Sequence, residues 1–213
     1  MPRKKIKTSS DEPKPQTPAK EEGTDQIDES ALSGLLSTLE GPDMRSMALF
    51  GEIEEEKAAD VCVGLLMLSR ASDKELDPIN FYISTYGGNA DDMFSIYDMM
   101  NVAKKNCEIY TYGLGKVMSA GVLILANGTP GKRYVGKHCR VMIHSCNAGS
   151  VGDIHNMKNE MEQIQSQQDE YINALVSVSS MTKRQLTRLL DRKVNVYLTA
   201  QEAIEYGIAD HIM

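Results

Sequence analysis

The chain has 213 residues, 41% of them hydrophobic, and a formal net charge of −7 at pH 7. This length suffices for one domain with a substantial core, and the acidic balance argues against a general nucleic-acid-binding protein. No apolar run approaches the roughly 20 residues of a membrane-spanning helix, so we expect no membrane segment.

Cysteine and histidine are scattered and show neither CxxC spacing nor a zinc-ligand pattern. Reduced thiols in a cytoplasmic protein are the simplest interpretation. The sequence also lacks a phosphate-binding P-loop and a GxGxxG fingerprint, so we expect no metal and no cofactor. The four cysteines are Cys62, Cys107, Cys139 and Cys146.

The N-terminal stretch, residues 1–29, is rich in Lys, Glu, Asp, Pro, Ser and Thr and nearly devoid of large apolar residues. Such a segment cannot bury enough surface to offset its ordering entropy, so we predict a disordered tail or a propeptide. The folded domain is predicted to cover residues 30–213, beginning with a short helix over 30–39.

Beyond residue 46, strand-like and helix-like segments alternate along the chain. This alternation predicts an α/β fold with a mainly parallel sheet. Strands are expected at 47–50, 79–84, 107–112, 134–135, 139–143 and 196–198, and helices at 52–70, 90–104, 120–126, 154–178, 182–190 and 200–206.

Ser119 lies in a glycine-rich stretch, residues 113–121, that leads into an apolar run. The pattern indicates a strand, a glycine-rich loop and then a helix, with Ser119 at the helix N-terminus. Serine is a favoured N-cap residue, so a purely structural role is one interpretation. The other is a nucleophile, because the free N–H groups of a helix start favour negative charge nearby.

His144 ends the apolar run that starts at Arg140. A serine at a helix start and a histidine at a strand end can meet in space and form a nucleophile–base pair. Cys146 lies two residues beyond the histidine, so a reactive thiol is conceivable, although an ordinary loop or core cysteine is commoner. The two candidate catalytic residues are therefore Ser119 and His144.

Five motifs, in the same order and at matching spacing, make the chain from Met47 onward resemble the ClpP family of proteases. They are YGG at 86–88, MSAG at 118–121, GKRY at 131–134, RVMIH at 140–144 and YLTAQEAIEYGIAD at 197–210. The resemblance implies a ClpP/crotonase-like fold, built of repeated ββα-type units with a mainly parallel sheet and a protruding handle helix. It also implies a serine peptidase domain.

For the reaction, the resemblance implies Ser119 as nucleophile and His144 as general base. The family's oxyanion hole falls on the backbone N–H groups of Gly88 and Ala120. On residues alone, Gly87-Gly88 would be an ordinary turn, but a double glycine after a strand also lets a substrate backbone approach closely.

For substrate binding, the resemblance points to Gly87 and to Gly149, Ser150 and Val151. The last three lie where the family has a glycine-rich strand, against which a substrate is expected to add as an extended strand through main-chain hydrogen bonds.

The third triad position departs from the family pattern, since Asn195 stands where the family usually has aspartate. An asparagine can orient the histidine through its carbonyl but adds no negative charge. Asp191, four residues earlier, is an alternative third member after a small shift.

The resemblance also implies partners. Two stacked seven-membered rings would enclose a chamber, and an ATP-driven unfoldase of the ClpX, ClpA or ClpC type would feed it unfolded polypeptides. Two alternatives stay open. One is a weak or inactive ring subunit that acts with an active paralogue, which Asn195 favours. The other is an enoyl-CoA hydratase-like enzyme, which Ser119 and His144 disfavour because that chemistry commonly uses acidic residues.

Overall fold

The computed structural model of the chain describes residues 45–70, 76–192 and 194–213. The predicted tail over 1–29 and the predicted helix over 30–39 lie outside these residues. The boundary of the folded domain at residue 30 therefore stays a prediction.

The described part of the chain is α/β, as predicted, with a seven-stranded sheet. Its main path runs β1-β2-β3-β4-β7, and β5 pairs with both β3 and β6. Every pairing is parallel except β5 with β6. The strands are β1 (Ser46–Phe50), β2 (Ile79–Thr85), β3 (Ile109–Met118), β4 (Arg133–Val135), β5 (Arg140–Ile143), β6 (Val196–Leu198) and β7 (His211–Ile212).

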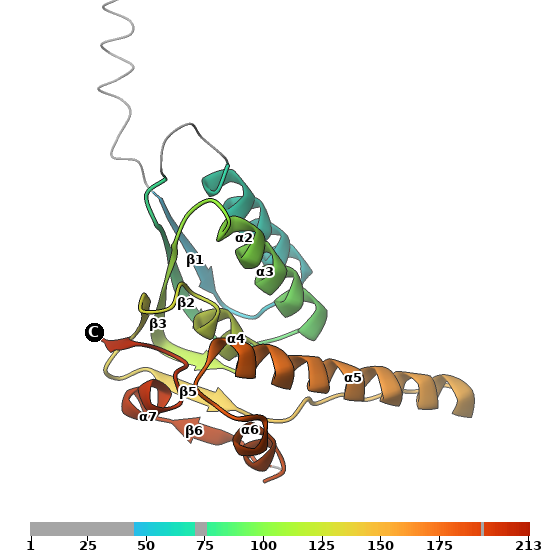
Figure 1. Cartoon of the computed structure of the whole chain (residues 1–213). Coiled ribbons are helices and arrows are strands. Elements are labelled where there is room, and N and C mark those ends of the chain that lie inside the picture. Colours follow the sequence, from blue (N-terminus) through green and yellow to red (C-terminus); the bar gives the residue numbers. More distant parts are fainter. Residues whose placement is uncertain (1–44, 71–75, 193) are drawn as a thin grey trace, which may run out of the picture. The chain divides into compact units, whose positions relative to one another are not determined.

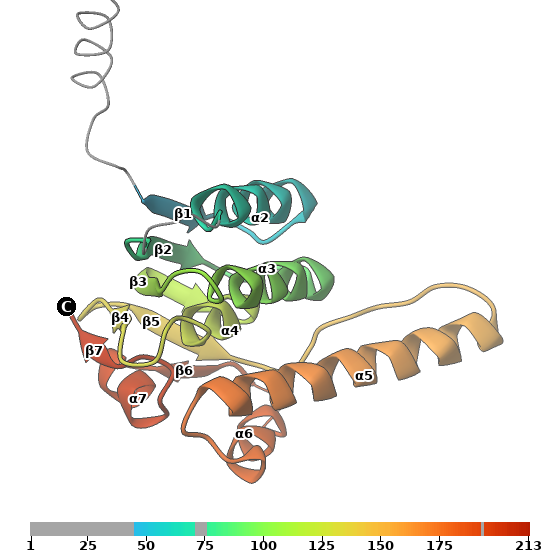
Figure 2. The same cartoon turned by 45° about the horizontal axis from the view of Figure 1, so that its top comes forward.

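Helices α2, α3 and α4 lie on the same side of strands β1, β2 and β3 (Figures 1 and 2). The ββα order that the resemblance implied occurs where β4 and β5 precede α5. The helices are α2 (Glu55–Leu68), α3 (Ala90–Ala103), α4 (Ala120–Ala126), α5 (Ile154–Val178), α6 (Lys183–Leu190) and α7 (Ala200–Glu205).

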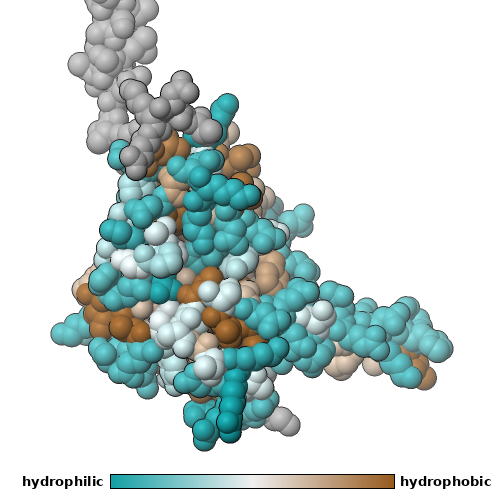
Figure 3. All heavy atoms as spheres, in the orientation of Figure 1, coloured by the Kyte–Doolittle hydropathy of each residue, from teal (hydrophilic) through white to brown (hydrophobic). Residues whose placement is uncertain are grey.

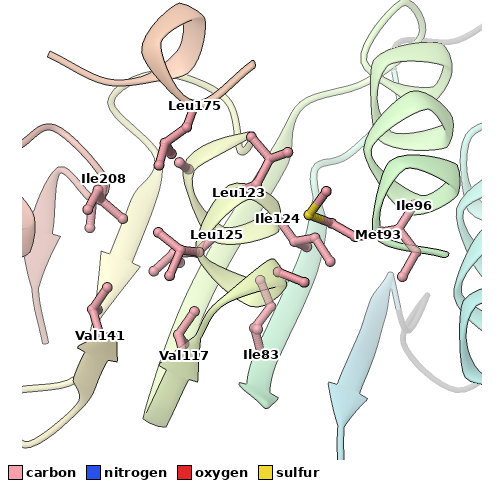
Figure 4. Packing of buried hydrophobic residues seen from close by; sticks show 14 of the residues in the cluster. Ile83, Met93, Ile96, Val117, Leu123, Ile124, Leu125, Val141, Leu175 and Ile208 are labelled. Carbon is pink, nitrogen blue, oxygen red and sulfur yellow. The ribbon is translucent and has the colours of Figure 1, made fainter. Parts of the chain in front are cut away.

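The short helix α4 is the centre of the hydrophobic core. All seven of its residues are buried, and Leu123, Ile124 and Leu125 lie between the sheet and the neighbouring helices (Figure 4). A helix that is apolar all round is stable only when it is enclosed on every side. The residue before it, Ser119, is thereby attached to a fully buried part of the domain.

Strand β3 is longer than predicted, because residues 113–118 continue the strand instead of forming a loop. The pairing with β2 shifts register here, since Ile83 lies opposite Gly113 and Thr85 opposite Val117. Gly115 sits in this bulge with a φ of +65°, which glycine adopts without steric cost. The bulge lets β3 leave β4 and continue alongside β5.

The opposite face of the sheet carries a row of stacked rings. Tyr82 and Tyr112 stack with centroids 4.8 Å apart, and Tyr112 and Tyr134 with centroids 5.0 Å apart. His211 of β7 continues the row at 5.2 Å from Tyr134. Strand β7 was not predicted, because a two-residue strand is too short to show a periodic pattern.

The C-terminal segment is attached to β4 through Arg133 and Asp210. The Arg133 Nε donates to Asp210 Oδ2 at 2.8 Å, and the Arg133 backbone N–H donates to the same oxygen at 3.0 Å. The guanidinium also donates to the carbonyl oxygens of Ala126 and Val178. This partly buried pair therefore joins β4, α4, α5 and the end of the chain.

Helix α5 spans 25 residues, with the predicted bounds, and extends beyond the rest of the described unit (Figures 1 and 2). Its apolar residues divide into two groups. Tyr171 and Leu175 are buried in the core, whereas Met157 and Met161 are 42% and 67% exposed. The protruding helix that the resemblance implied is thus present.

Candidate active site

Ser119 stands at the junction of β3 and α4 with a strained backbone. Its φ is 54° and its ψ is −122°, and among the described residues no other residue except glycine has a positive φ. Its side chain makes no capping hydrogen bond to α4, although it occupies the N-cap position. The interpretation of Ser119 as a mere N-cap is therefore wrong, and its hydroxyl is free for another partner.

That partner is His144, whose Nε2 lies 2.8 Å from Ser119 Oγ. The pairing of β3 with β5 explains the meeting. The two strands are parallel, and Met118 lies opposite Met142. The segments that follow the two strands therefore leave the sheet at the same edge. The backbone N–H of Ser119 also donates to the Met142 carbonyl oxygen at 2.7 Å. The predicted contact between the two side chains is thus present.

Gly87 and Gly88 fit between Ser119 and the segment before α2. A Cβ at Gly87 would lie 2.7 Å from the Cβ of Ser119, and a Cβ at Gly88 would collide with the Ile53 backbone. Gly88 forms a parallel bridge to Ile53 in which the Gly87 carbonyl and the Asn89 N–H make the hydrogen bonds. The N–H of Gly88 itself takes no part in that bridge, and it faces away from Ile53.

The first N–H of α4 belongs to Ala120. The first N–H groups of an α-helix have no intrahelical partner, and this donor is one of them. Gly88 and Ala120 both line the same cavity as Ser119 and His144. Backbone N–H donors beside a serine hydroxyl are the groups that stabilise a developing oxyanion, and the assignment of Gly88 and Ala120 to that role stays a prediction.

The cavity has a volume of about 390 Å³. Helix α5 contributes Ile164, Gln167 and Tyr171 to its wall, and the chain after His144 contributes Cys146 to Ala148. Ile164 and Tyr171 fit an apolar stripe along the sequence of α5, but a stripe does not indicate which of its residues reach a site. Their role in the pocket was therefore missed.

Gly149, Ser150 and Val151, the expected substrate-binding strand, follow directly after this wall. They form no strand in the described chain, and the lining of the cavity from this segment ends at Ala148. Val151 is fully exposed. Their unpaired backbone leaves donors and acceptors free, so a role in binding an extended peptide stays a prediction.

Asn195 precedes the first residue of β6, just as His144 follows the last residue of β5. The antiparallel register pairs Ile143 with Val196, so its continuation places Asn195 opposite His144. Asn195 is nevertheless exposed, and no hydrogen bond joins these two described residues. The alternative third member, Asp191, caps the C-terminus of α6, is exposed and likewise makes no bond to His144. The third member of the triad therefore stays a prediction.

Cys146 lines the cavity, but its environment does not favour a thiolate. Burial raises the pKa of the thiol, and its own backbone hydrogen bond opposes that shift only in part. The protonated thiol is a poor nucleophile, so Ser119 is the better candidate.

Within the described ranges, no group of three or more His, Cys, Asp or Glu side chains is placed to hold a metal ion. No helix in the same ranges combines the length and the apolar character that crossing a bilayer requires.

Comparison with known proteins shows which family the chain is similar to. The sequence pattern of the family described as Clp protease matches residues 38–213. An "ATP-dependent Clp protease proteolytic subunit 2" of Corynebacterium efficiens is 35% identical over 79% of this chain and 82% of the relative. A "proteolytic subunit 1" of Corynebacterium jeikeium is 36% identical over 79% and 87%.

A subunit 2 of Gluconobacter oxydans is 31% identical over 92% of this chain and 86% of the relative. The matched region contains Ser119, His144 and every other residue of the cavity. The family match and these relatives show that the chain belongs to the Clp protease family of serine-type peptidases.

Proposed function

We propose that this chain is the endopeptidase subunit of a chambered protease that degrades unfolded polypeptides to short peptides. The observation that carries the proposal is the 2.8 Å contact between Ser119 Oγ and His144 Nε2, in a cavity that Gly88 and Ala120 also line. A hydroxyl, a base and two free N–H donors are the groups that acyl transfer requires.

In the proposed reaction, Ser119 Oγ attacks the carbonyl carbon of the scissile peptide bond while His144 Nε2 accepts the hydroxyl proton. The N–H groups of Gly88 and Ala120 donate to the oxyanion of the tetrahedral intermediate. His144 then gives its proton to the leaving amine, and the C–N bond breaks. Water, deprotonated by His144, hydrolyses the acyl-enzyme and restores Ser119.

Asn195 is proposed as the third member of a Ser-His-Asn variant of the triad. Its support is the sheet register, since residues directly opposite on antiparallel strands have neighbouring side chains. A rotation of the Asn195 side chain toward His144 Nδ1 would let its carbonyl oxygen accept the ring N–H. Until that contact forms, Ser119 and His144 act as a dyad.

The proposed assembly is a homo-oligomer of two stacked seven-membered rings that receives substrate from an unfoldase of the ClpX, ClpA or ClpC type. Two separate exposed apolar surfaces support it. One lies on the projecting half of α5, at Met157 and Met161 (Figure 3), and the other on α2, at Val63, Leu66 and Met67. A ring needs one contact around the ring and another between rings.

The test is hydrolysis of a short fluorogenic peptide by the purified, assembled protein. We expect turnover that Ser119→Ala abolishes and that Ser177→Ala, a change of an exposed serine on α5, leaves unchanged. Degradation of a folded protein should in addition require the unfoldase and ATP. An assembled wild-type protein that hydrolyses no peptide would contradict the proposal.

A second candidate function is a weakly active ring subunit that depends on an active paralogue. The exposed Asn195, which makes no bond to His144, favours it. Asn195→Asp distinguishes the two: we expect a carboxylate to raise peptide turnover by about tenfold, through stabilisation of the imidazolium. Turnover that stays absent in Asn195→Asp would favour the paralogue-dependent subunit.

A further inference from the structure

The strained backbone of Ser119 needs to be held at both ends. Its N–H donates to the Met142 carbonyl oxygen at 2.7 Å, which fixes it to β5. Its carbonyl oxygen accepts from the Val122 N–H at 3.0 Å, within the first turn of α4. The same carbonyl oxygen accepts a second hydrogen bond, at 3.3 Å, from the phenol of Tyr171 on α5.

We propose that Tyr171 is a positioning residue for the nucleophile, because its O–H holds the Ser119 carbonyl and thereby the left-handed backbone that directs Oγ at His144. This inference rests on the proposed function, since it concerns the reactivity of the same serine. It goes beyond that function by assigning a task to a side chain outside the Ser-His pair and its backbone donors.

The phenol is well suited to this task, because α5 is fixed against three parts of the site over one helical turn. Tyr171 itself is only 8% exposed. One turn earlier, Gln168 Oε1 accepts from the backbone N–H of Cys146 at 3.0 Å, two residues after His144. Gln167 Nε2 donates to Asp91 Oδ1 at 2.6 Å, near the Gly88 end of the cavity.

The Tyr171 phenol also remains a hydrogen-bond donor at every relevant pH. Burial raises the pKa of the Tyr171 phenol, and the nearby Cys146 adds to the shift. The phenol therefore stays protonated at every pH at which a Ser-His pair works, so its hydrogen bond to the Ser119 carbonyl does not depend on pH in that range.

The test compares wild type with Tyr171→Phe, which removes one oxygen and keeps the ring in place. The measured quantities are the rate of Ser119 modification by a fluorophosphonate probe, and kcat and KM for a short peptide. We expect labelling and kcat to fall together by about fivefold with KM unchanged, as for the loss of one neutral hydrogen bond. Tyr206→Phe is the matched control, because Tyr206 packs on the core away from the cavity.

A purely structural role would lower the melting temperature of Tyr171→Phe and leave its labelling rate at 25 °C equal to that of wild type, which would overturn the proposal. Tyr171→p-aminophenylalanine, which restores a donor, should recover most of the rate. If Tyr171→Phe does not assemble, p-aminophenylalanine is compared with p-cyanophenylalanine, a group that only accepts, and equal rates again overturn the proposal. Failure of the wild type itself to label would instead contradict the proposed function.

Discussion

The two sides of His144 differ in how firmly the fold fixes them. On one side, the parallel pairing of β3 with β5 and the buried helix α4 bring Ser119 to 2.8 Å from the imidazole. On the other side, the antiparallel pairing of β5 with β6 ends at Val196, one residue short of Asn195. Ser119 and Asn195 both lie one residue beyond the last paired residue, but the Ser119 N–H bonds the Met142 carbonyl and the buried helix α4 follows it directly, whereas Asn195 is exposed.

The contrast teaches that the buried core fixes the positions of the nucleophile and the base. The third member instead lies at an exposed strand end. Ser119 has its N–H, its carbonyl and its hydroxyl all engaged. Asn195 is exposed. We therefore expect large losses of activity from changes on the Ser119 side and small ones from changes on the Asn195 side.

Gly87→Ala should have the largest effect, because it disturbs the Ser119 side directly. The new methyl group would meet the Ser119 Cβ at 2.7 Å and the Met118 carbonyl oxygen at 2.8 Å, at a residue whose φ is +99°. We expect kcat for a short peptide to fall by about 10²- to 10³-fold, comparable to the loss of an oxyanion donor. Gly131→Ala is the control, since its φ is also positive but nothing lies within 4 Å of its Cβ. Equal losses in both variants would contradict the assignment.

Asp210→Asn tests how firmly the C-terminal segment is attached to β4. Asn195 belongs to the same C-terminal part of the chain. Removing the carboxylate leaves the Arg133 guanidinium partly buried without its counter-charge, so we expect about 2 kcal/mol of destabilisation at pH 7 in denaturant unfolding. Asp60→Asn, at an exposed position of α2, should change stability by less than about 0.5 kcal/mol.

The pH dependence of this effect has a definite sign. Burial alone would raise the pKa of the Asp210 carboxyl, but hydrogen bonds and the charge of Arg133 outweigh it and lower the pKa. A lowered pKa adds stability above the unfolded value of about 3.9, and that stability is lost as the pH falls through the folded value. The difference between wild type and Asp210→Asn should therefore be full at pH 7 and shrink below about pH 4. A difference that grows in acid would refute the assigned sign.

Asn195→Ala should have the smallest effect. Because no hydrogen bond reaches His144 from Asn195, we expect kcat to change by less than about threefold, far below the 10⁴-fold known for the aspartate of a fully assembled trypsin-type triad. A loss of 100-fold or more would show that Asn195 contacts the imidazole during turnover.

Much of this site could be predicted from sequence because it depends on local patterns. The apolar run before His144 and the helix after Ser119 identify two strand ends, and parallel strands end at a common edge. The capping boxes of α6 and α7 are equally local, and the structure contains both. Side-chain contacts between distant elements leave no such pattern.

Two examples show what the sequence does not reveal. Nothing in the residues 113–118 indicates that a bulge continues β3, because glycines favour loops and bulges alike. Tyr171 fits an apolar helical stripe, and only the packing of α5 against α4 places its phenol at the Ser119 carbonyl. The same limit explains why the position of the Asn195 side chain could not be predicted.

The most direct test of the central claim is modification of the assembled protein by a fluorophosphonate probe, with the adduct located by mass spectrometry. If His144 activates Ser119 without an aspartate, the adduct forms on Ser119 and is lost in His144→Ala, while His138→Ala, a change of an exposed histidine, labels as wild type. An assembled protein that stays unlabelled, or one whose His144→Ala variant labels at the wild-type rate, would contradict the claim.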